Sequence, residues 1–312
     1  MLSNSLLKSL HISSIHTVRS RSNGRYSRSN PTPLLIHSFA GAPSTHWRVS
    51  LPPFAGSSSI HRAKTMAPEI PFDPSTCDLA ELITEADFHS LCSPDGFLSI
   101  CGFGSLLSEK SARSTFPELR DFRVGVLRGF RRVFAHVAPI FYDRGIARPE
   151  TAEISSLSVE PCEGEWLVVT VFEIKKEEVS AFMEREHEFR FLAAFPEDLE
   201  GKPFTRPAVV CARYSDDEYF RIRCKGSREI FFERYGRHNI DKIWRDDILP
   251  CRVYLRHCVL AAKNLGQIAY NNFLDHTFIG DRKTTIREYL ASRGSGIMDE
   301  EPPEELKSRY GG

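Results

Sequence analysis

An acidic segment near the middle of the chain, residues 184–188, carries side chains suited to proton transfer. It reads Glu-Arg-Glu-His-Glu and lies between phenylalanines. A carboxyl group among apolar neighbours loses solvent, which raises its pKa toward the range useful for general acid–base catalysis. Charge runs more often form a solvated face, and the sequence also allows that interpretation. An extended backbone would put Glu186 and Glu188 on one side, whereas a helix would put Glu184 and Glu188 on one face.

A glycine-rich turn is the second candidate for chemistry. Gly102-Phe103-Gly104-Ser105-Leu106 directly follows an apolar run that predicts a buried strand. Two glycines two residues apart allow a tight turn whose backbone N–H groups can hold an anion or a polarised carbonyl oxygen. A dinucleotide-binding turn needs a third glycine at position 107, which is a leucine, so that function is disfavoured. A plain turn between a strand and a helix is the alternative.

Other single residues leave two interpretations open. Arg144 and Arg185 could bind a substrate carboxylate through paired hydrogen bonds, or they could pair with neighbouring acidic residues. His187 could move a proton, although a histidine between two glutamates more often belongs to a surface ion pair. His257 and Cys258 lie in an amphipathic pattern, which favours packing over metal binding.

The elements that would position these residues follow from hydrophobic periodicity. Apolar or alternating runs predict strands at 97–101, 124–137, 154–159, 166–174, 189–195 and 208–214. Helical spacing predicts helices at 79–91, 175–188, 253–265 and 284–290. Thr285 and Glu288 are in capping-box register at the start of the last helix. Since strands predominate and do not alternate one by one with helices, we expect a mixed or barrel-like α+β domain.

The N-terminal composition predicts a targeting segment. Residues 1–66 contain eight Lys or Arg, fifteen Ser and no Asp or Glu, which is typical of an organelle transit peptide. The serine content favours a chloroplast over a mitochondrion, and translation from Met66 would leave a cytoplasmic protein. The remaining 246 residues carry 33 basic and 41 acidic side chains, so we expect no nucleic-acid partner. No apolar run is long enough to span a membrane.

The cysteines do not indicate a metal or a redox site. None of the eight forms a C-x-x-C pair, which disfavours zinc ribbons and thioredoxin-type centres. Cys101 and Cys211 lie in apolar runs and are expected to be small core residues. We therefore predict the following organisation: a disordered transit peptide at 1–66, a lead helix at 67–96, one folded domain at 97–290 with an irregular insertion at about 216–249, and a flexible tail at 291–312.

The order of these segments resembles the γ-glutamylcyclotransferase family, with its ChaC-type glutathione-specific enzymes and γ-glutamylamine cyclotransferases. Residues 100–106 are similar to the family's strand and Tyr-Gly-Ser-Leu loop, with Phe103 in place of the tyrosine. Residues 129–134 resemble its G-[YFW]-x-R-x-F segment. Arg144 belongs to an Asp-Arg-Gly sequence where ChaC-type members carry an Arg-Gly loop.

Two later segments extend the resemblance, which covers about residues 97–274. Residues 181–188 are similar to the helix end that carries the family's acid–base glutamate, which places that role at Glu186. Residues 250–255 resemble a late P-S-x-x-Y-L helix. The family's Ile/Val-Trp pair is replaced by Leu107-Ser108.

The resemblance implies an α+β fold, a γ-glutamylcyclotransferase-like small β-barrel with flanking helices. It also implies a reaction in which the α-amine of a γ-glutamyl group attacks its own γ-carbonyl, releasing 5-oxoproline and a free amine. Glu186 would be the catalytic acid and base, and the 102–106 loop with Arg144 would bind the small-molecule γ-glutamyl substrate. No metal or cofactor is required.

Two other functions stay open at this point. One is a catalytically silent module of this fold that binds a ligand or a partner. The other is an enzyme that removes a γ-glutamyl protecting group from an amine in a biosynthetic route. The leaving group and the oligomeric state stay open as well.

Overall fold

A computed structural model of the chain describes residues 79–312. The expected transit peptide and the first part of the expected lead helix, residues 67–78, lie outside the described residues. Within 79–312, no helix combines the length and the apolar character needed to cross a membrane.

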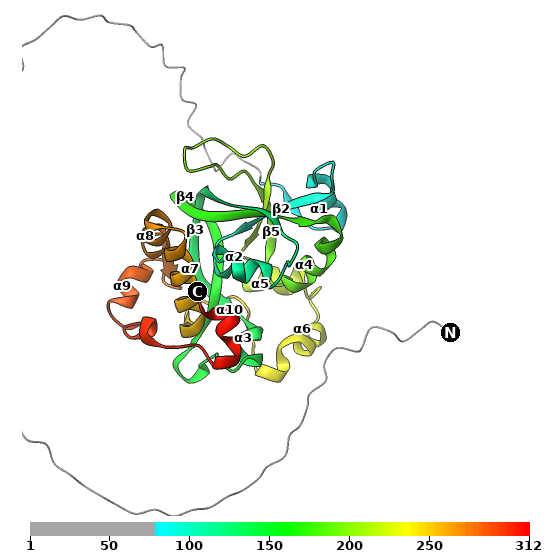
Figure 1. Cartoon of the computed structure of the whole chain (residues 1–312). Coiled ribbons are helices and arrows are strands. Elements are labelled where there is room, and N and C mark those ends of the chain that lie inside the picture. The colour runs from blue at the N-terminus through cyan, green and yellow to red at the C-terminus, as the bar shows by residue number, and fades with distance from the viewer. Residues whose placement is uncertain (1–78) are drawn as a thin grey trace, which may run out of the picture. The chain divides into compact units, whose positions relative to one another are not determined.

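The centre of the described part is a mixed sheet, in which the strands run in the order β1-β5-β6-β2-β4-β3-β8 and β7 pairs with β4 (Figure 1). Its strands are β1 (Glu81–Leu82), β2 (Phe97–Gly102), β3 (Arg120–Val137), β4 (Glu153–Lys175), β5 (Arg190–Ala194), β6 (Ala208–Ala212), β7 (Leu249–Pro250) and β8 (Thr277–Ile279). The expected α+β class is therefore confirmed. We expected a small β-barrel, but in the described strands β1 and β8 end the order without pairing to each other, so a closed barrel is not shown.

The two longest strands, β3 and β4, form a long antiparallel pair within the sheet. The predicted strands at 154–159 and 166–174 are one strand, because both halves of β4 pair with β3. The register shifts between Arg128 and Phe130, opposite residues 162–165 of β4. Gly164, at φ +79°, adopts a conformation that side chains disfavour, and this lets β4 bend and continue. The second half of β4 also pairs with β2, which leads directly into the glycine turn.

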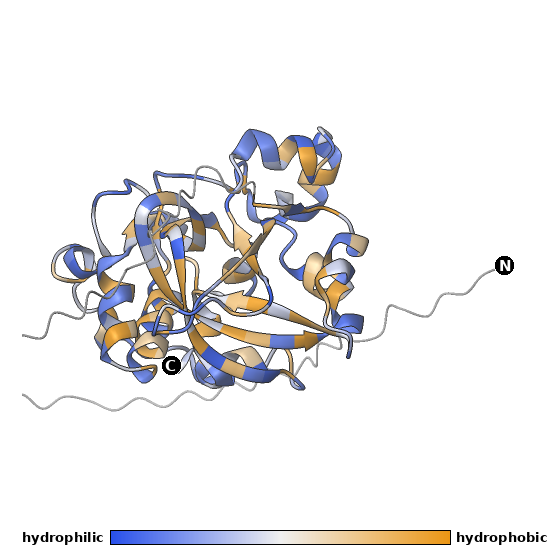
Figure 2. Ribbon diagram, turned by 90° about the horizontal axis from the view of Figure 1, so that it is seen from above, coloured by the Kyte–Doolittle hydropathy of each residue, from blue (hydrophilic) through white to orange (hydrophobic). Residues whose placement is uncertain are grey.

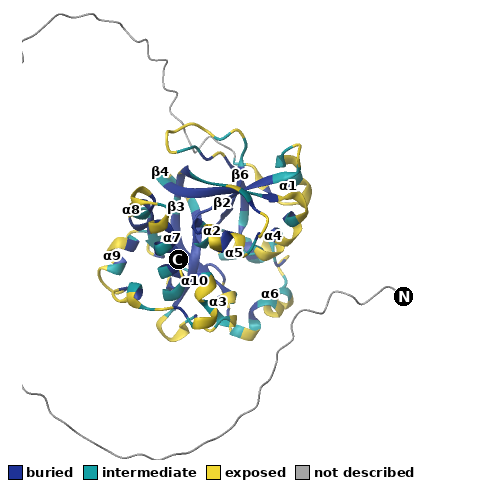
Figure 3. Cartoon of the chain, in the orientation of Figure 1, coloured by how far each residue is buried: buried dark blue, intermediate teal, exposed yellow. Residues whose placement is uncertain are grey.

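The helices surround the sheet. They are α1 (Glu85–Leu91), α2 (Glu109–Arg113), α3 (Pro139–Asp143), α4 (Val179–Arg185), α5 (Asp216–Ile222), α6 (Arg228–Tyr235), α7 (Arg252–Asn264), α8 (Gln267–Asp275), α9 (Ile286–Leu290) and α10 (Lys307–Tyr310). In Figure 2 hydrophobic and hydrophilic residues alternate along both the strands and the helices, as expected where each has one face toward a core. Figure 3 shows the strands buried and the outer helix faces exposed. The core therefore lies between the sheet and the inner faces of the helices.

The first predicted helix is shorter than expected. Residues 79–91 have helical spacing, but Glu81–Leu82 form a strand that pairs with β5, and the helix begins only at Glu85. Thr84 is the N-cap residue, and its backbone N–H donates to the Asp87 carboxylate at 2.7 Å. Sheet pairing and the cap together outweigh the periodic pattern upstream of the cap.

The segment 216–249 was expected to be an irregular insertion, and the structure corrects the expected irregularity. It contains α5 and α6, and its side chains enter the core: Tyr219, Tyr235 and Trp244 are buried. Ser215 caps α5 by accepting a hydrogen bond from the backbone of Glu218 at 3.2 Å. These large aromatic side chains are spaced along an otherwise polar segment. The polar composition therefore concealed the segment's contribution to the core.

The segment 291–312 was expected to be a flexible tail, and the structure corrects this too. Ile297 and Tyr310 are buried, and α10 packs against α7 and α2. Gly312 donates its N–H to His257 Nδ1 at 3.2 Å. The Gly, Pro and acidic composition conceals a few large apolar contacts, and those contacts hold the segment in place.

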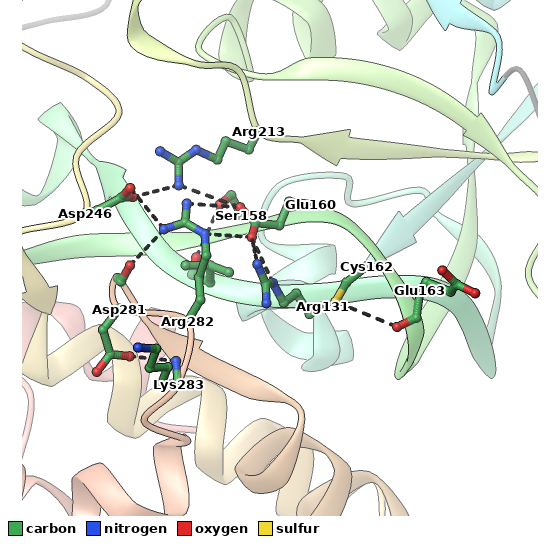
Figure 4. Close-up of polar contacts among 12 residues, drawn as sticks. Arg131, Ser158, Glu160, Cys162, Glu163, Arg213, Asp246, Asp281, Arg282 and Lys283 are labelled. Atoms are coloured by element: carbon green, nitrogen blue, oxygen red, sulfur yellow. Dashed lines mark hydrogen bonds and ion pairs between the residues drawn. The ribbon is translucent and has the colours of Figure 1, made fainter. Parts of the chain in front are cut away.

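A cluster of ion pairs fastens the loops at one edge of the sheet (Figure 4). Arg131 and Arg282 both bind Glu160 of β4, with shortest N–O distances of 2.7 and 2.8 Å. Arg213 and Arg282 also bind Asp246, at 2.8 and 3.0 Å. The cluster thereby connects β3, β4, the end of the 216–249 segment and the loop after β8.

Candidate active site

A cavity of about 620 Å³ lies where β2 ends. Its walls contain the whole 102–106 loop, Arg144 and Glu186, which are all the site residues proposed from the sequence. These residues come from segments separated by about 40 positions or more along the chain. The structure thus brings the glycine turn and the acidic helix end to the same hollow. Within the described residues, no group of three or more His, Cys, Asp or Glu side chains could hold a metal ion.

The glycine turn is built by close packing. A Cβ atom on Gly102 would lie 2.6 Å from Thr170 Oγ1, and one on Gly104 would lie 2.6 Å from the Tyr254 hydroxyl. Thr170 Oγ1 donates to the Leu106 carbonyl oxygen at 2.9 Å. Tyr254 accepts a hydrogen bond from Ser105 N at 3.4 Å. The glycines are therefore required by these close contacts, which leave no room for a Cβ atom.

A buried arginine supports the turn from behind. Arg132, on β3, donates to the carbonyl oxygen of Phe103 at 2.8 Å and to Asn272 Oδ1 at 3.1 Å, and it also donates to the Val168 carbonyl oxygen. Burial lowers the pKa of its guanidinium to about 9. Arg132 lies in the segment 129–134, but it was not predicted to have this role. The signal was an arginine two residues from both Phe130 and Phe134, positions that share its face of the strand.

Glu186 lies at the point where the acidic segment leaves its helix. Its N–H donates to the Phe182 carbonyl oxygen at 3.0 Å and ends α4, and its side chain is 19% exposed. Arg185 Nε approaches Glu186 Oε1 to 3.0 Å. Glu184 points elsewhere: its side chain is 70% exposed and pairs with Arg234 at 3.2 Å. Because α4 ends at Arg185, Glu186 and Glu188 share the cavity wall and Glu184 does not.

Glu188 is a second carboxyl in the cavity, and sequence analysis gave it no role. Desolvation by burial raises its pKa to about 6. The Tyr235 hydroxyl donates to Glu188 Oε1 at 3.0 Å, and Tyr219 is hydrogen-bonded to Tyr235. Both tyrosines come from the segment expected to be an irregular insertion. No pattern near residue 188 could reveal partners that lie 31 and 47 positions away.

Within residues 79–312, His187 does not form the surface ion pair considered from the sequence. Its Nδ1 lies 3.4 Å from the Tyr219 hydroxyl. Burial, together with the positive charge of Arg234, lowers the pKa of His187 to about 4. The imidazole is therefore neutral at physiological pH.

Two other polar groups face the cavity from β3 and β4. His136 Nδ1 lies 2.7 Å from Ser156 Oγ, while His136 Nε2 is buried and has no hydrogen-bond partner within 79–312. Burial lowers the pKa of His136 to about 3, so the ring is neutral. A neutral imidazole with one free nitrogen can donate to or accept from a bound ligand, depending on its tautomer.

The wall near the chain terminus is also cationic. Arg144 donates to the Tyr310 hydroxyl and lies 5.4 Å from the centre of its ring. Arg309 donates to Ser114 Oγ at 2.6 Å. Neither Arg309 nor Tyr310 was predicted as a site residue, since that segment was expected to be flexible. His257 and Cys258 are buried in α7, in agreement with the packing interpretation.

The raised pKa of Glu188 predicts a pH dependence of stability. Its folded-state pKa of about 6 exceeds the reference value of 4.5, so folding favours the protonated carboxyl. This contribution is complete below pH 4.5 and is lost as the pH rises through 6, which costs about 2 kcal/mol. Glu188→Gln stays neutral, so its free energy of unfolding, measured in urea at pH 5 and pH 7.5, should change less with pH than that of wild type.

Glu184→Gln is the control for this measurement, because Glu184 is exposed on the same segment. It should keep the wild-type pH dependence. If the free energy of unfolding of Glu188→Gln changed with pH as much as that of wild type, burial would not raise the pKa of the Glu188 carboxyl.

Comparisons with known proteins give limited information. The chain matches no protein-family model and no curated protein sequence. Among solved structures it resembles a gamma-glutamyl cyclotransferase, with 16% identity, a TM-score of 0.31 and coverage of 46% of this chain and 88% of that one. It also resembles an uncharacterized protein from Homo sapiens (17%, 0.31, 48% and 90%) and a protein from Arabidopsis thaliana (11%, 0.29, 47% and 97%). At these TM-scores the likenesses carry no argument about the site.

Proposed function

We propose that this cavity converts a γ-glutamyl peptide or amine to 5-oxoproline and a free amine. The observation that supports this most directly is that the glycine turn and Glu186 line one cavity. Ring closure within the substrate needs no protein nucleophile. It needs a group that moves a proton and donors that hold the carbonyl oxygen or the α-carboxylate. The cavity contains a candidate for each.

The reaction follows from these groups. Glu186 removes a proton from the α-ammonium, and the freed amine attacks the γ-carbonyl carbon. A new C–N bond closes the five-membered ring as the original amide C–N bond breaks. Glu186 passes this proton to the departing nitrogen, which keeps the electron pair of the broken bond. It then transfers a second proton from the ring nitrogen to the departing amine, so the lactam is neutral and the amine leaves as an ammonium. Backbone N–H groups of the 102–106 loop stabilise the charge on the carbonyl oxygen.

The neighbours of Glu186 have distinct roles in this proposal. Arg185, at 3.0 Å, orients the Glu186 carboxylate toward the cavity. Glu188 is a second carboxyl whose pKa of about 6 suits proton exchange near neutral pH. Arg144 binds the α-carboxylate of the γ-glutamyl group.

The test is direct measurement of the product. Purified full-length chain is incubated separately with glutathione, γ-glutamyl-alanine and γ-glutamyl-lysine, and 5-oxoproline is quantified by mass spectrometry. Release from at least one substrate supports the proposal, and the preferred substrate identifies the leaving group. Binding of all three without product would instead support a catalytically silent module. If the chain neither bound these compounds nor released 5-oxoproline, both the enzyme and the γ-glutamyl-binding module would be excluded.

We also propose that residues 1–66 direct the protein to the chloroplast. The support is compositional: basic and serine-rich residues without any acid. A fluorescent protein fused behind residues 1–66 should enter plastids, and the full chain started at Met66 should stay in the cytoplasm. Mitochondrial import of the fusion would reassign the address.

A further inference from the structure

Among the described residues, three arginines line the cavity, and two of them have no acidic partner there. Arg144, Arg185 and Arg309 all face it, together with two carboxyls, Glu186 and Glu188. Arg185 is paired with Glu186. Within residues 79–312, no ion pair joins Arg144 or Arg309 to a carboxylate.

Of these two cations, Arg309 has the stronger need for an anionic partner. Its side chain is half-buried, and it donates only to hydroxyl groups: Ser114 Oγ at 2.6 Å and Thr115 Oγ1 at 3.3 Å. Its Nε is buried and has no hydrogen-bond partner within the described part. Burial lowers the pKa of the guanidinium, and the charges of Arg185 and Arg144 contribute in the same direction. A bound anion would offset the repulsion between these arginines.

The chain terminus holds Arg309 in position. Tyr310 is buried beside His257, with ring centres 5.6 Å apart. Earlier in the same segment, Glu301 pairs with Arg256 of α7 at 2.8 Å. The guanidinium therefore belongs to a fixed wall of the cavity, as a binding group must.

Charge matching indicates which ligand suits this wall. A γ-glutamyl group brings one α-ammonium, matched by Glu186, and one α-carboxylate, matched by Arg144. Arg309 then remains without a counter-ion. A γ-glutamylamine has no further anion to offer, whereas a γ-glutamyl peptide has the carboxylate of its leaving group.

We propose that Arg309 binds a carboxylate on the leaving group, so that the site prefers γ-glutamyl peptides to γ-glutamylamines. This inference rests on the proposed function. It gives the C-terminal segment, which lies outside the region of family resemblance, a role in substrate selection. Ser114 and Thr115 orient the guanidinium from the end of α2.

The experiment compares two substrates that differ only in this carboxylate, γ-glutamyl-alanine and γ-glutamyl-alaninamide. Wild-type chain should show a kcat/KM about tenfold or more higher for the acid. Arg309→Ala should remove that preference by raising KM for the acid, with little change for the amide. Arg309→Lys should restore part of it, since a point charge replaces a planar fork.

Lys307→Ala is the matched control. It removes one positive charge from the same helix, but Lys307 is exposed and pairs with Glu304 at 2.8 Å. It should keep the wild-type preference for the acid. Circular dichroism on each variant checks folding, and Arg309→Gln replaces Arg309→Ala if the latter unfolds. Equal kcat/KM values for the two substrates in wild type, or an unchanged preference in a folded Arg309 variant, would overturn the inference.

Failure of the proposed function has a different signature. Wild-type chain would then release no 5-oxoproline from either substrate. The affinities of the same two compounds, measured by calorimetry, would then test whether Arg309 binds the leaving-group carboxylate. Tighter binding of the acid that is lost in Arg309→Ala would support the anion site without turnover. Equal binding of acid and amide would refute it.

Discussion

Glu186→Gln should slow 5-oxoproline release by about a hundredfold or more while leaving the fold intact. The amide has nearly the shape of the carboxyl but can no longer accept the proton of the α-ammonium. Glu186 is at the edge of the cavity and ends a short helix through its backbone, which the substitution keeps. Rates come from mass spectrometry of 5-oxoproline, and circular dichroism reports the fold.

Glu184→Gln is the matched control, because the residue lies two positions away but is exposed and pairs with Arg234. It should retain wild-type turnover. Near-normal turnover by Glu186→Gln would remove this residue from the mechanism. If Glu188→Gln showed the large loss instead, the acid–base role would move to the carboxyl held by Tyr235.

Arg132→Met should lower the free energy of unfolding by roughly 3 to 5 kcal/mol. Methionine fills similar space but donates no hydrogen bonds, so the carbonyl oxygens of Phe103 and Val168 lose a donor in a buried place. The removed charge offsets part of this cost, since a buried guanidinium is itself poorly solvated. Urea unfolding at pH 7.5 measures the difference.

The control lies on the same strand. Arg128 is 56% exposed and pairs with Glu197, so Arg128→Met should cost less than about 1 kcal/mol. Similar losses for the two variants would mean that Arg132 does not support the turn. The structure also predicts that Arg132→Met weakens substrate binding, because the Phe103 carbonyl belongs to the turn that lines the cavity.

Much of the site was predictable from short segments. The apolar run before Gly102 predicts β2, and the two glycines after it predict the turn that the structure contains. The helical spacing at 253–265 predicts α7 within one residue at each end, and the pair Thr285 and Glu288 forms the expected capping box. These features depend on neighbouring residues, and neighbours are what a sequence displays.

The errors share one cause. The segments 216–249 and 291–312 were judged by polar or flexible composition, yet each buries a few large side chains, such as Tyr235 and Tyr310. β4 was predicted as two strands separated by a polar stretch, but a β-bulge accommodates that stretch within one continuous strand. A few long-range contacts decided the outcome in each case, and average composition does not record them.

Sequence pattern alone predicted most of the helices and strands, the glycine turn, and an acidic helix end whose carboxyl groups could transfer protons. Folding in three dimensions established which carboxyl is desolvated, which arginine lacks a counter-ion and which segments close the cavity. Burial and charge pairing depend on distances between atoms that are far apart along the chain, such as those of Glu188 and Tyr235. Those distances exist only once the sheet and its helices have assembled.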